Sequence, residues 1–184
     1  SYTIPEGVTA LGSNSMQMAQ VSAVTIPASV RSVNSYALNS VAATTVTFLG
    51  NPDFGTEFES GTPGAGALSN SKNLTEIVNF PKVSALPTGL FSGDVSLTSF
   101  TIPDTVTSIG DTVFSDTGIT EITIPAGVQS IGNSVFSIIT TADDPVKTSI
   151  KVIFEKGSQL TSIGSNCFTR LESYSALFDS ADVT

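Results

Sequence analysis

The residues whose type and spacing could support chemistry are two pairs of carboxylates, Glu57 with Glu59 and Asp143 with Asp144. Two carboxylates can hydrolyse a glycosidic bond only when they lie within roughly 5–10 Å of each other on either side of it. Nothing in the sequence indicates such convergence, so solvated loop residues are the more economical interpretation. The same oxygens could bind calcium weakly, although the spacing of a calcium-binding loop is absent.

Other common catalytic arrangements are excluded because the chain contains no histidine. A Ser-His-Asp triad and a Cys–His pair both require one. The single cysteine, Cys167, stands where neighbouring copies of the repeat described below have Val113 and Val135, so we predict that it is a buried apolar residue. The sequence therefore predicts a protein that is not an enzyme and that needs no metal or cofactor.

The charge balance narrows the class of partner. The chain carries 16 acidic and 7 basic residues, a net charge of −9 over 184 residues. Scattered basic residues cannot form the stripe that nucleic acids require, and the same charge disfavours anionic membranes. Runs of roughly 18 apolar residues, which could cross a membrane, do not occur. An acidic, Ser/Thr/Gly-rich chain without disulfides favours a bacterial secreted or cell-surface protein, read here as a mature or trimmed fragment.

The elements that must position these residues follow from a recurring phrase, Ile-Thr-Ile-Pro at 122–125 and its variants. The third residue of each copy falls at 4, 26, 48, 80, 102, 124 and 154, and four of the six steps are 22 residues long. A period in the range of about 20–50 residues is typical of a solenoid.

One unit is clearest at residues 119–136. Ile122 and Ile124 alternate with polar neighbours, which predicts a short strand with one buried face. Pro125 ends that strand, because proline has no N–H to donate. Further inward residues follow after turns, the last on a short turn or helical segment: Val128, Ile131, Val135 and Phe136.

This unit resembles the BspA-like leucine-rich repeat family of bacterial and protist surface proteins, whose pattern is roughly L-x-x-I-x-I-P-x-x-V-x-x-I-G-x-x-A-F. Residues 97–136 match it closely, and residues 158–168 match it again. The resemblance implies a right-handed solenoid that is mostly β, with a parallel β-sheet on the concave face and short turns or helical segments opposite. It also implies cell-surface display and adhesion, and it carries no catalytic residue to this chain.

We expect residues 1–184 to form a single domain of about seven units with two inserts, near 50–66 and 137–149. Inserts in a solenoid map to loops that often bind partners. Phe54 and Phe58 are therefore candidates, one capping the core and the other anchoring a partner. The carboxylates named above are the other binding candidates within the inserts: Glu57, Glu59, Asp143 and Asp144.

The outward face of the predicted sheet supplies the remaining candidates, Thr101, Thr123 and Glu121. One outward column is nearly all threonine: Thr3, Thr25, Thr47, Asn79, Thr101, Thr123 and Ile153. Stacked hydroxyls could bind a ligand, but threonine pairs also simply stabilise sheets. Aromatic anchors, which dominate many binding hot spots, are missing from this column.

Two functions remain open at this point. The first is a non-catalytic, extracellular or cell-surface module that adheres, as a monomer, to a protein or glycan on a host or partner cell. The second is a structural spacer that presents other domains of a longer surface protein.

Overall fold

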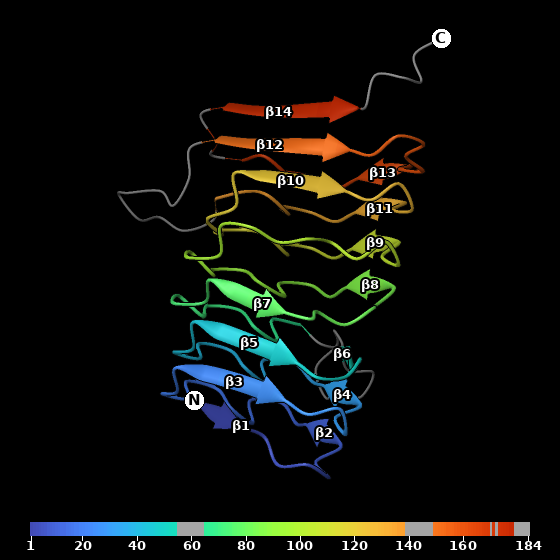
Figure 1. Cartoon of the computed structure of the whole chain (residues 1–184). Helices are drawn as coiled ribbons and strands as arrows, with labels where there is room; N and C mark the ends of the chain where they lie inside the picture. The colour runs from blue at the N-terminus through green and yellow to red at the C-terminus, as the bar shows by residue number, and fades with distance from the viewer. Residues whose placement is uncertain (55–64, 139–148, 170, 172, 179–184) are drawn as a thin grey trace.

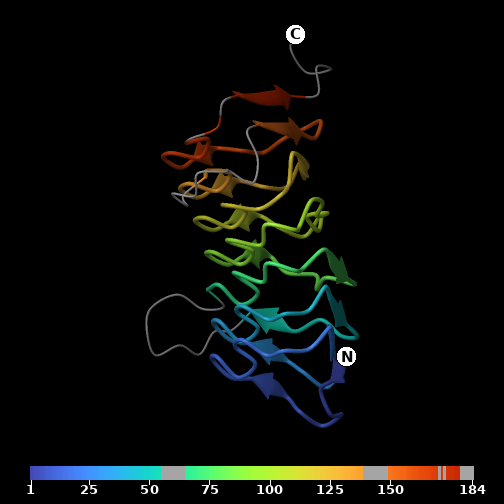
Figure 2. The same cartoon turned by 90° about the vertical axis from the view of Figure 1, so that its left-hand side faces the viewer.

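The structure, a computed structural model, describes residues 1–54, 65–138, 149–169, 171 and 173–178. Short strands stack above one another along its length, and every pairing between them is parallel (Figure 1). β1, in blue, and β14, in red, lie at opposite ends of the stack (Figure 2). The chain is thus a repeat array of parallel strands, as its period predicts.

The first side of the array is built by the Ile-Thr-Ile-Pro phrases. Its strands form two groups, β1-β3-β5-β7 and β10-β12-β14. Buried and more exposed residues alternate along β3, β5, β10 and β12, and Ile122 and Ile124 keep only 2% and 1% of their surface. The strands are β1 (Tyr2–Thr3), β3 (Ala23–Ile26), β5 (Thr45–Phe48), β7 (Glu76–Val78), β10 (Glu121–Ile124), β12 (Ser149–Phe154) and β14 (Ser173–Phe178).

A second set of strands, which the sequence did not predict, forms another side. Each has two residues, of which the second is aliphatic or aromatic; this residue is buried in five of the strands, half-buried at Phe54 and exposed at Ile163. They pair as β2-β4-β6 and as β8-β9-β11-β13. Their bounds are β2 (Ala10–Leu11), β4 (Ser32–Val33), β6 (Asp53–Phe54), β8 (Ala85–Leu86), β9 (Ser108–Ile109), β11 (Ser130–Ile131) and β13 (Ser162–Ile163).

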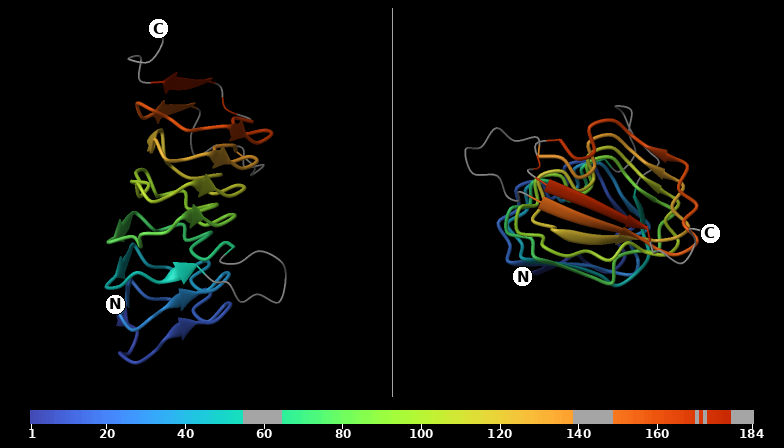
Figure 3. Two further views of the ribbon diagram at one scale, coloured as in Figure 1. Left: turned by 90° about the vertical axis from the view of Figure 1, so that its right-hand side faces the viewer. Right: turned by 90° about the horizontal axis from the view of Figure 1, so that it is seen from above.

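The third side consists of turns, where the sequence allowed for short helical segments; no residue that the structure describes is helical. In five of these turns, two residues four positions apart adopt left-handed backbone angles, such as Tyr36 and Ser40, both at φ 56°. The turns stack through backbone bonds: Tyr36 N–H donates to Ala65 C=O at 3.0 Å, and Ser40 N–H donates to Ser69 C=O at 2.8 Å. Seen along the stack, the sides close into a ring (Figure 3).

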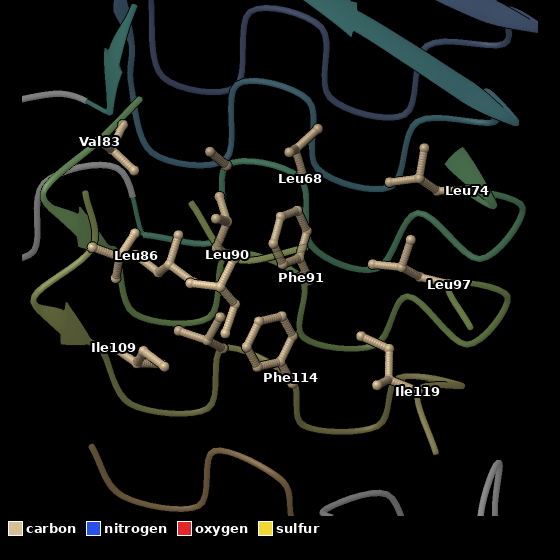
Figure 4. Packing of buried hydrophobic residues seen from close by; sticks show 14 of the residues in the cluster. Leu68, Leu74, Val83, Leu86, Leu90, Phe91, Leu97, Ile109, Phe114 and Ile119 are labelled. Atoms are coloured by element: carbon tan, nitrogen blue, oxygen red, sulfur yellow. The ribbon is translucent and has the colours of Figure 1, made fainter. Parts of the chain in front are cut away.

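The core fills the space between the three sides in columns that run along the array (Figure 4). Leu68, Phe91 and Phe114 form one column, and Leu74, Leu97 and Ile119 form another. The Phe91 and Phe114 rings stack with centroids 5.8 Å apart, and the series continues through Phe136 and Phe168. One coil cannot bury these rings alone, so stability comes from neighbouring coils.

Cys167 lies in this core, 3% exposed, as predicted. Its Sγ donates to the carbonyl of Gly132 at 3.1 Å, and burial raises the pKa of the thiol. Gly132 itself has to be glycine, because a Cβ there would lie 2.7 Å from the backbone nitrogen of Asp111.

The regular coil extends further into both predicted inserts than the spacing suggested. Asp53 and Phe54 form β6, and the coil resumes at Ala65, whose carbonyl accepts from Tyr36. On the other side, Ile138 is buried and donates to Thr169, and β12 begins at Ser149. The extra residues therefore fall between 54 and 65 and between 138 and 149. The first set of extra residues leaves the coil between the second side and the turn side, and the second set leaves it between the turn side and the first side.

Candidate functional site

The first side is interrupted between β7 and β10. Residues 98–102 carry the phrase Thr-Ser-Phe-Thr-Ile, which predicts a strand, and Ile102 is buried as expected. However, the backbone groups of this segment hydrogen bond to neither neighbouring strand. No arrow is drawn there in Figure 1. The prediction of a paired strand at this copy is therefore wrong.

A shift in register at Asn79 precedes the interruption. Val78 pairs with Thr47, so Asn79, and not Phe80, follows at the level of Phe48. The predicted threonine column is thus also wrong at Asn79, because Val78 occupies that place. Asn79 has φ 54°, in the left-handed region, and such a residue cannot continue a strand. β7 consequently ends after three residues.

Aromatic rings lie beneath the interruption. Phe80 and Phe100 contact each other edge to face with centroids 5.0 Å apart. Phe91 lies against Phe100 at 4.8 Å. In the paired coils, the strand places corresponding to Phe100 hold smaller residues, Val46 and Ile122.

A hollow of about 1130 Å³ opens at this interruption. Three candidates predicted from the outward columns line it together: Thr101 on the unpaired segment, and Glu121 and Thr123 on β10. Apolar residues also border it: Ile77, Phe80, Phe100, Ile102 and Ile122. Of these, Ile102 and Ile122 bury their side chains in the core.

The hollow is strongly acidic. Its lining includes four carboxylates and one lysine: Glu76, Asp104, Glu121, Glu155 and Lys82. Glu121 Oε2 accepts from Lys151 Nζ at 3.0 Å, and Glu155 Oε2 accepts from the Ala126 N–H at 3.1 Å. The carboxylates of Glu76 and Asp104 form no hydrogen bond or ion pair within the part of the chain that the structure describes.

Phe54 lies away from this hollow, on β6, where it is half-buried against the core. Its ring stacks on Phe80 at 5.5 Å and meets Phe48 edge to face at 6.3 Å. Phe54 thus occupies the core-facing role that we assigned to one of the two insert phenylalanines. The other candidates in the inserts fall outside the described residues: Glu57, Phe58, Glu59, Asp143 and Asp144.

Three carboxylates of the hollow were missed from the sequence: Glu76, Asp104 and Glu155. Their distance along the chain hides their proximity, because they come from three different coils. The sequence did contain a signal near the interruption itself. Phenylalanine stands at 80 and at 100, on successive coils, and an asparagine directly precedes the first of them.

Asp94, unlike the carboxylates of the hollow, is buried, and it lies on the turn side. Its Oδ1 accepts the N–H of Ser71 at 2.8 Å, and its Oδ2 has no hydrogen-bond partner among the residues that the structure describes. Burial raises the pKa of this carboxyl well above its ordinary value near 3.8, although the bond from Ser71 opposes the shift. Asp94 is fully enclosed, so it belongs to the scaffold.

Neither a metal site nor a membrane-spanning helix stands out in the residues described. Among them, no three histidine, cysteine or carboxylate residues lie together in a way that could hold a metal ion. Likewise, none of them forms a helix long and apolar enough to cross a bilayer.

Comparison with known proteins gives a family and a fold. The family model described as the BspA type leucine rich repeat region matches in six copies, over residues 1–58 and 62–180. No curated protein matches the chain.

Two solved structures share the fold. A leucine-rich repeat protein from Bacteroides ovatus is 16% identical, with a TM-score of 0.50 over 95% of this chain, which spans 60% of that protein. A leucine rich cell surface protein from Faecalibacterium prausnitzii is 20% identical, with a TM-score of 0.52. The match covers 94% of this chain and 68% of that protein.

Proposed function

Because the chain belongs to the BspA-type leucine-rich repeat family, we propose that it is a non-catalytic binding module that mediates adhesion. The repeating residues of the family form the core and the turns, so the repeat itself supplies no catalytic group. Adhesion therefore has to use features that break the repeat.

The hollow between β7 and β10 is the observation that carries this proposal. It is the place where the sheet departs from the repeat, and it gathers Thr101, Thr123 and Glu121 on one face. Concave sites that combine an apolar floor with a few polar groups are typical ligand sites. The hollow is also open to solvent, so a macromolecular surface can reach it.

The place of action that we propose is the outside of a bacterial cell. Support comes from the structurally similar protein of Faecalibacterium prausnitzii, which is described as a cell surface protein. The acidic, disulfide-free composition agrees with this location. The partner would be a protein or glycan on a host or neighbouring cell, bound by a monomer of this chain.

A structural spacer is the second candidate function. It is favoured by the bland outward column of β1, β3 and β5, where threonine pairs with threonine from coil to coil. The chain also spans only 60% of the Bacteroides ovatus protein. A spacer would hold neighbouring domains apart and would bind nothing through the hollow.

Binding to immobilised matrix proteins, glycans and bacterial cells tests the choice between these functions. We expect binding by the wild-type chain and a loss of about tenfold or more, about 1.4 kcal/mol, in a Thr101→Gln/Thr123→Gln variant. The matched control is Thr3→Gln/Thr25→Gln, in the same column at the far end, which should bind normally. Absence of binding to any surface, or equal loss in both variants, would contradict the adhesive function.

A further inference from the structure

We propose that the array bends at residues 75–119, where the first side opens and closes while the opposite corner of the coil stays closed. The inference concerns the free protein and stands apart from the adhesive function. Three observations support it: a missing ladder on one side, a closely packed corner opposite to it, and an aromatic core between them.

The first side has no backbone hydrogen bonds to break at this level. Residues 98–102 lie between β7 and β10 and bond to neither, whereas four residue pairs join β3 to β5 in the regular part of the array. Each backbone bond contributes about 0.5–1.5 kcal/mol net, so opening the first side costs less here than between β3 and β5. Bending is therefore localised at this level.

The other two sides stay bonded over the same coils. On the second side, β8, β9 and β11 pair in an unbroken series. On the turn side, three backbone bonds of 2.8–3.2 Å join the coil that carries Phe91 to the next one. Their donor–acceptor pairs are Gly89–Asp111, Phe91–Val113 and Gly93–Ser115. Of the three sides, the first therefore opens at the lowest cost.

The corner where the second and turn sides meet lies opposite the first side of the coil. Backbones approach closely there, since a Cβ at Gly110 would lie 2.7 Å from the backbone nitrogen of Thr88. Gly110 N–H also donates to Leu86 C=O at 2.8 Å. One coil further on, Gly132 N–H donates to Ile109 C=O at 2.8 Å. This corner therefore stays closed and serves as the pivot of the bend.

The aromatic core beneath the first side tolerates the movement. Phe80 and Phe100 have centroids 5.0 Å apart, and Phe91 and Phe100 have centroids 4.8 Å apart. Aromatic pairs attract over centroid distances of about 4.5–7 Å, so these rings can separate by about 2 Å and remain in contact. Backbone hydrogen bonds tolerate only about 0.5 Å. The core thus permits an opening that a bonded ladder would prevent.

Distances between pairs of nitroxide labels, measured by electron paramagnetic resonance on the full chain, test the inference. Cys167→Val, which introduces the residue type of Val113 and Val135, supplies a background without native cysteine. Labels at Glu76→Cys and Glu121→Cys span the opening on the first side. We expect their spread of distances to exceed that of a bonded pair by about 2 Å.

Two matched pairs of labels locate the movement. Ala23→Cys with Glu76→Cys also spans two coil steps on the first side, through β3, β5 and β7, which are bonded. Ala85→Cys with Ser130→Cys spans the same coils as the test pair, but on the bonded second side. Both control pairs should give narrow distributions of distance. If Cys167→Val destabilises the chain, native Cys167 is retained, because its 3% exposure keeps it from the label.

Two results would overturn the inference. The first is an equally narrow distribution for Glu76 and Glu121, since the first side would then be as rigid as a bonded ladder. Fraying of residues 98–102 alone gives this result, because both labels lie on strands bonded to other neighbours. The second is a broad distribution for Ala85 and Ser130, because the coils would then separate as a whole instead of bending.

Discussion

Two stretches of the first side carry nearly the same phrase and adopt different structures. Residues 45–48 read Thr-Val-Thr-Phe and form β5, paired on both sides. Residues 100–103 read Phe-Thr-Ile-Pro, closer to the family pattern, and pair with neither neighbouring strand. The difference teaches that the repeated sequence specifies which residues face the core. The neighbouring coils decide whether the segment forms hydrogen bonds with the strands beside it.

The largest effect should come from changing a core-facing residue of the repeated phrase, a kind of residue that both stretches contain. Ile124 of β10 is an example. Ile124→Asp places an unpaired carboxylate in the core and should cost about 3–5 kcal/mol, enough to unfold a marginal array. Thr123→Ala, one residue away on the exposed face, should change stability by less than about 0.5 kcal/mol. Urea denaturation measures both, and similar values would mean that the inward and outward faces are misassigned.

The interrupted coil also contains Asp94, which makes a pH-dependent prediction. Because burial raises the pKa of this carboxyl, the folded state favours its protonated form. The stability that this preference contributes is complete below about pH 3.8, the ordinary value, and is lost as the pH rises through the raised pKa. A tenfold difference in proton affinity between the folded and unfolded states corresponds to about 1.4 kcal/mol.

Asp94→Asn removes this titration, so its stability relative to wild type should rise as the pH increases from acidic to neutral. Thermal denaturation at a series of pH values measures the difference. Asp53→Asn, at an exposed position, serves as the control and should show no comparable trend. A constant difference between Asp94→Asn and wild type would show that the carboxyl is not buried.

Asn79 lies in the coil between the two stretches, directly after β7, where the regular pairing of the first side stops. Its left-handed backbone suits asparagine and glycine but not β-branched residues. We expect Asn79→Val to cost about 1–2 kcal/mol and Asn79→Gly to be nearly neutral in chemical denaturation. If valine were tolerated as well as glycine, β7 would not end in a left-handed residue.

The smallest effect should come from the ion pair beside the hollow. Glu121 and Lys151 are both exposed, and such surface pairs contribute about 0–1 kcal/mol. Lys151→Ala should therefore barely change thermal stability, and added salt should reduce even that difference. A loss of several kcal/mol would show that this edge of the hollow is far less hydrated than its exposure indicates.

Much of the fold could be predicted because it repeats. Each inward residue occurs several times at a fixed spacing, so the columns through Phe91 and Phe114 and through Leu97 and Ile119 follow from the sequence. The second set of strands was missed because each has only two residues, too few for an alternating pattern. The sequence left open whether the third side forms turns or short helical segments, because most of the left-handed residues of the turns, such as Tyr36 and Thr112, are not glycine.

The hollow could be predicted only in part. Thr101, Thr123 and Glu121 share an outward face, which alternation along the strand reveals. Glu76 and Asp104 join them from other parts of the chain, where Asn79 ends β7 and residues 98–102 pair with neither neighbouring strand. Those effects depend on contacts between coils, and no pattern within one coil encodes them.

Amide hydrogen exchange along the first side tests the central claim, that neighbouring coils rather than the phrase decide where the ladder forms. The account predicts that the amides of 45–48, which are bonded on both sides, exchange more slowly than those of 99–102 by more than about tenfold. Equal protection of the two stretches would contradict it, because the phrase would then form the same ladder in both places and the hollow would be closed.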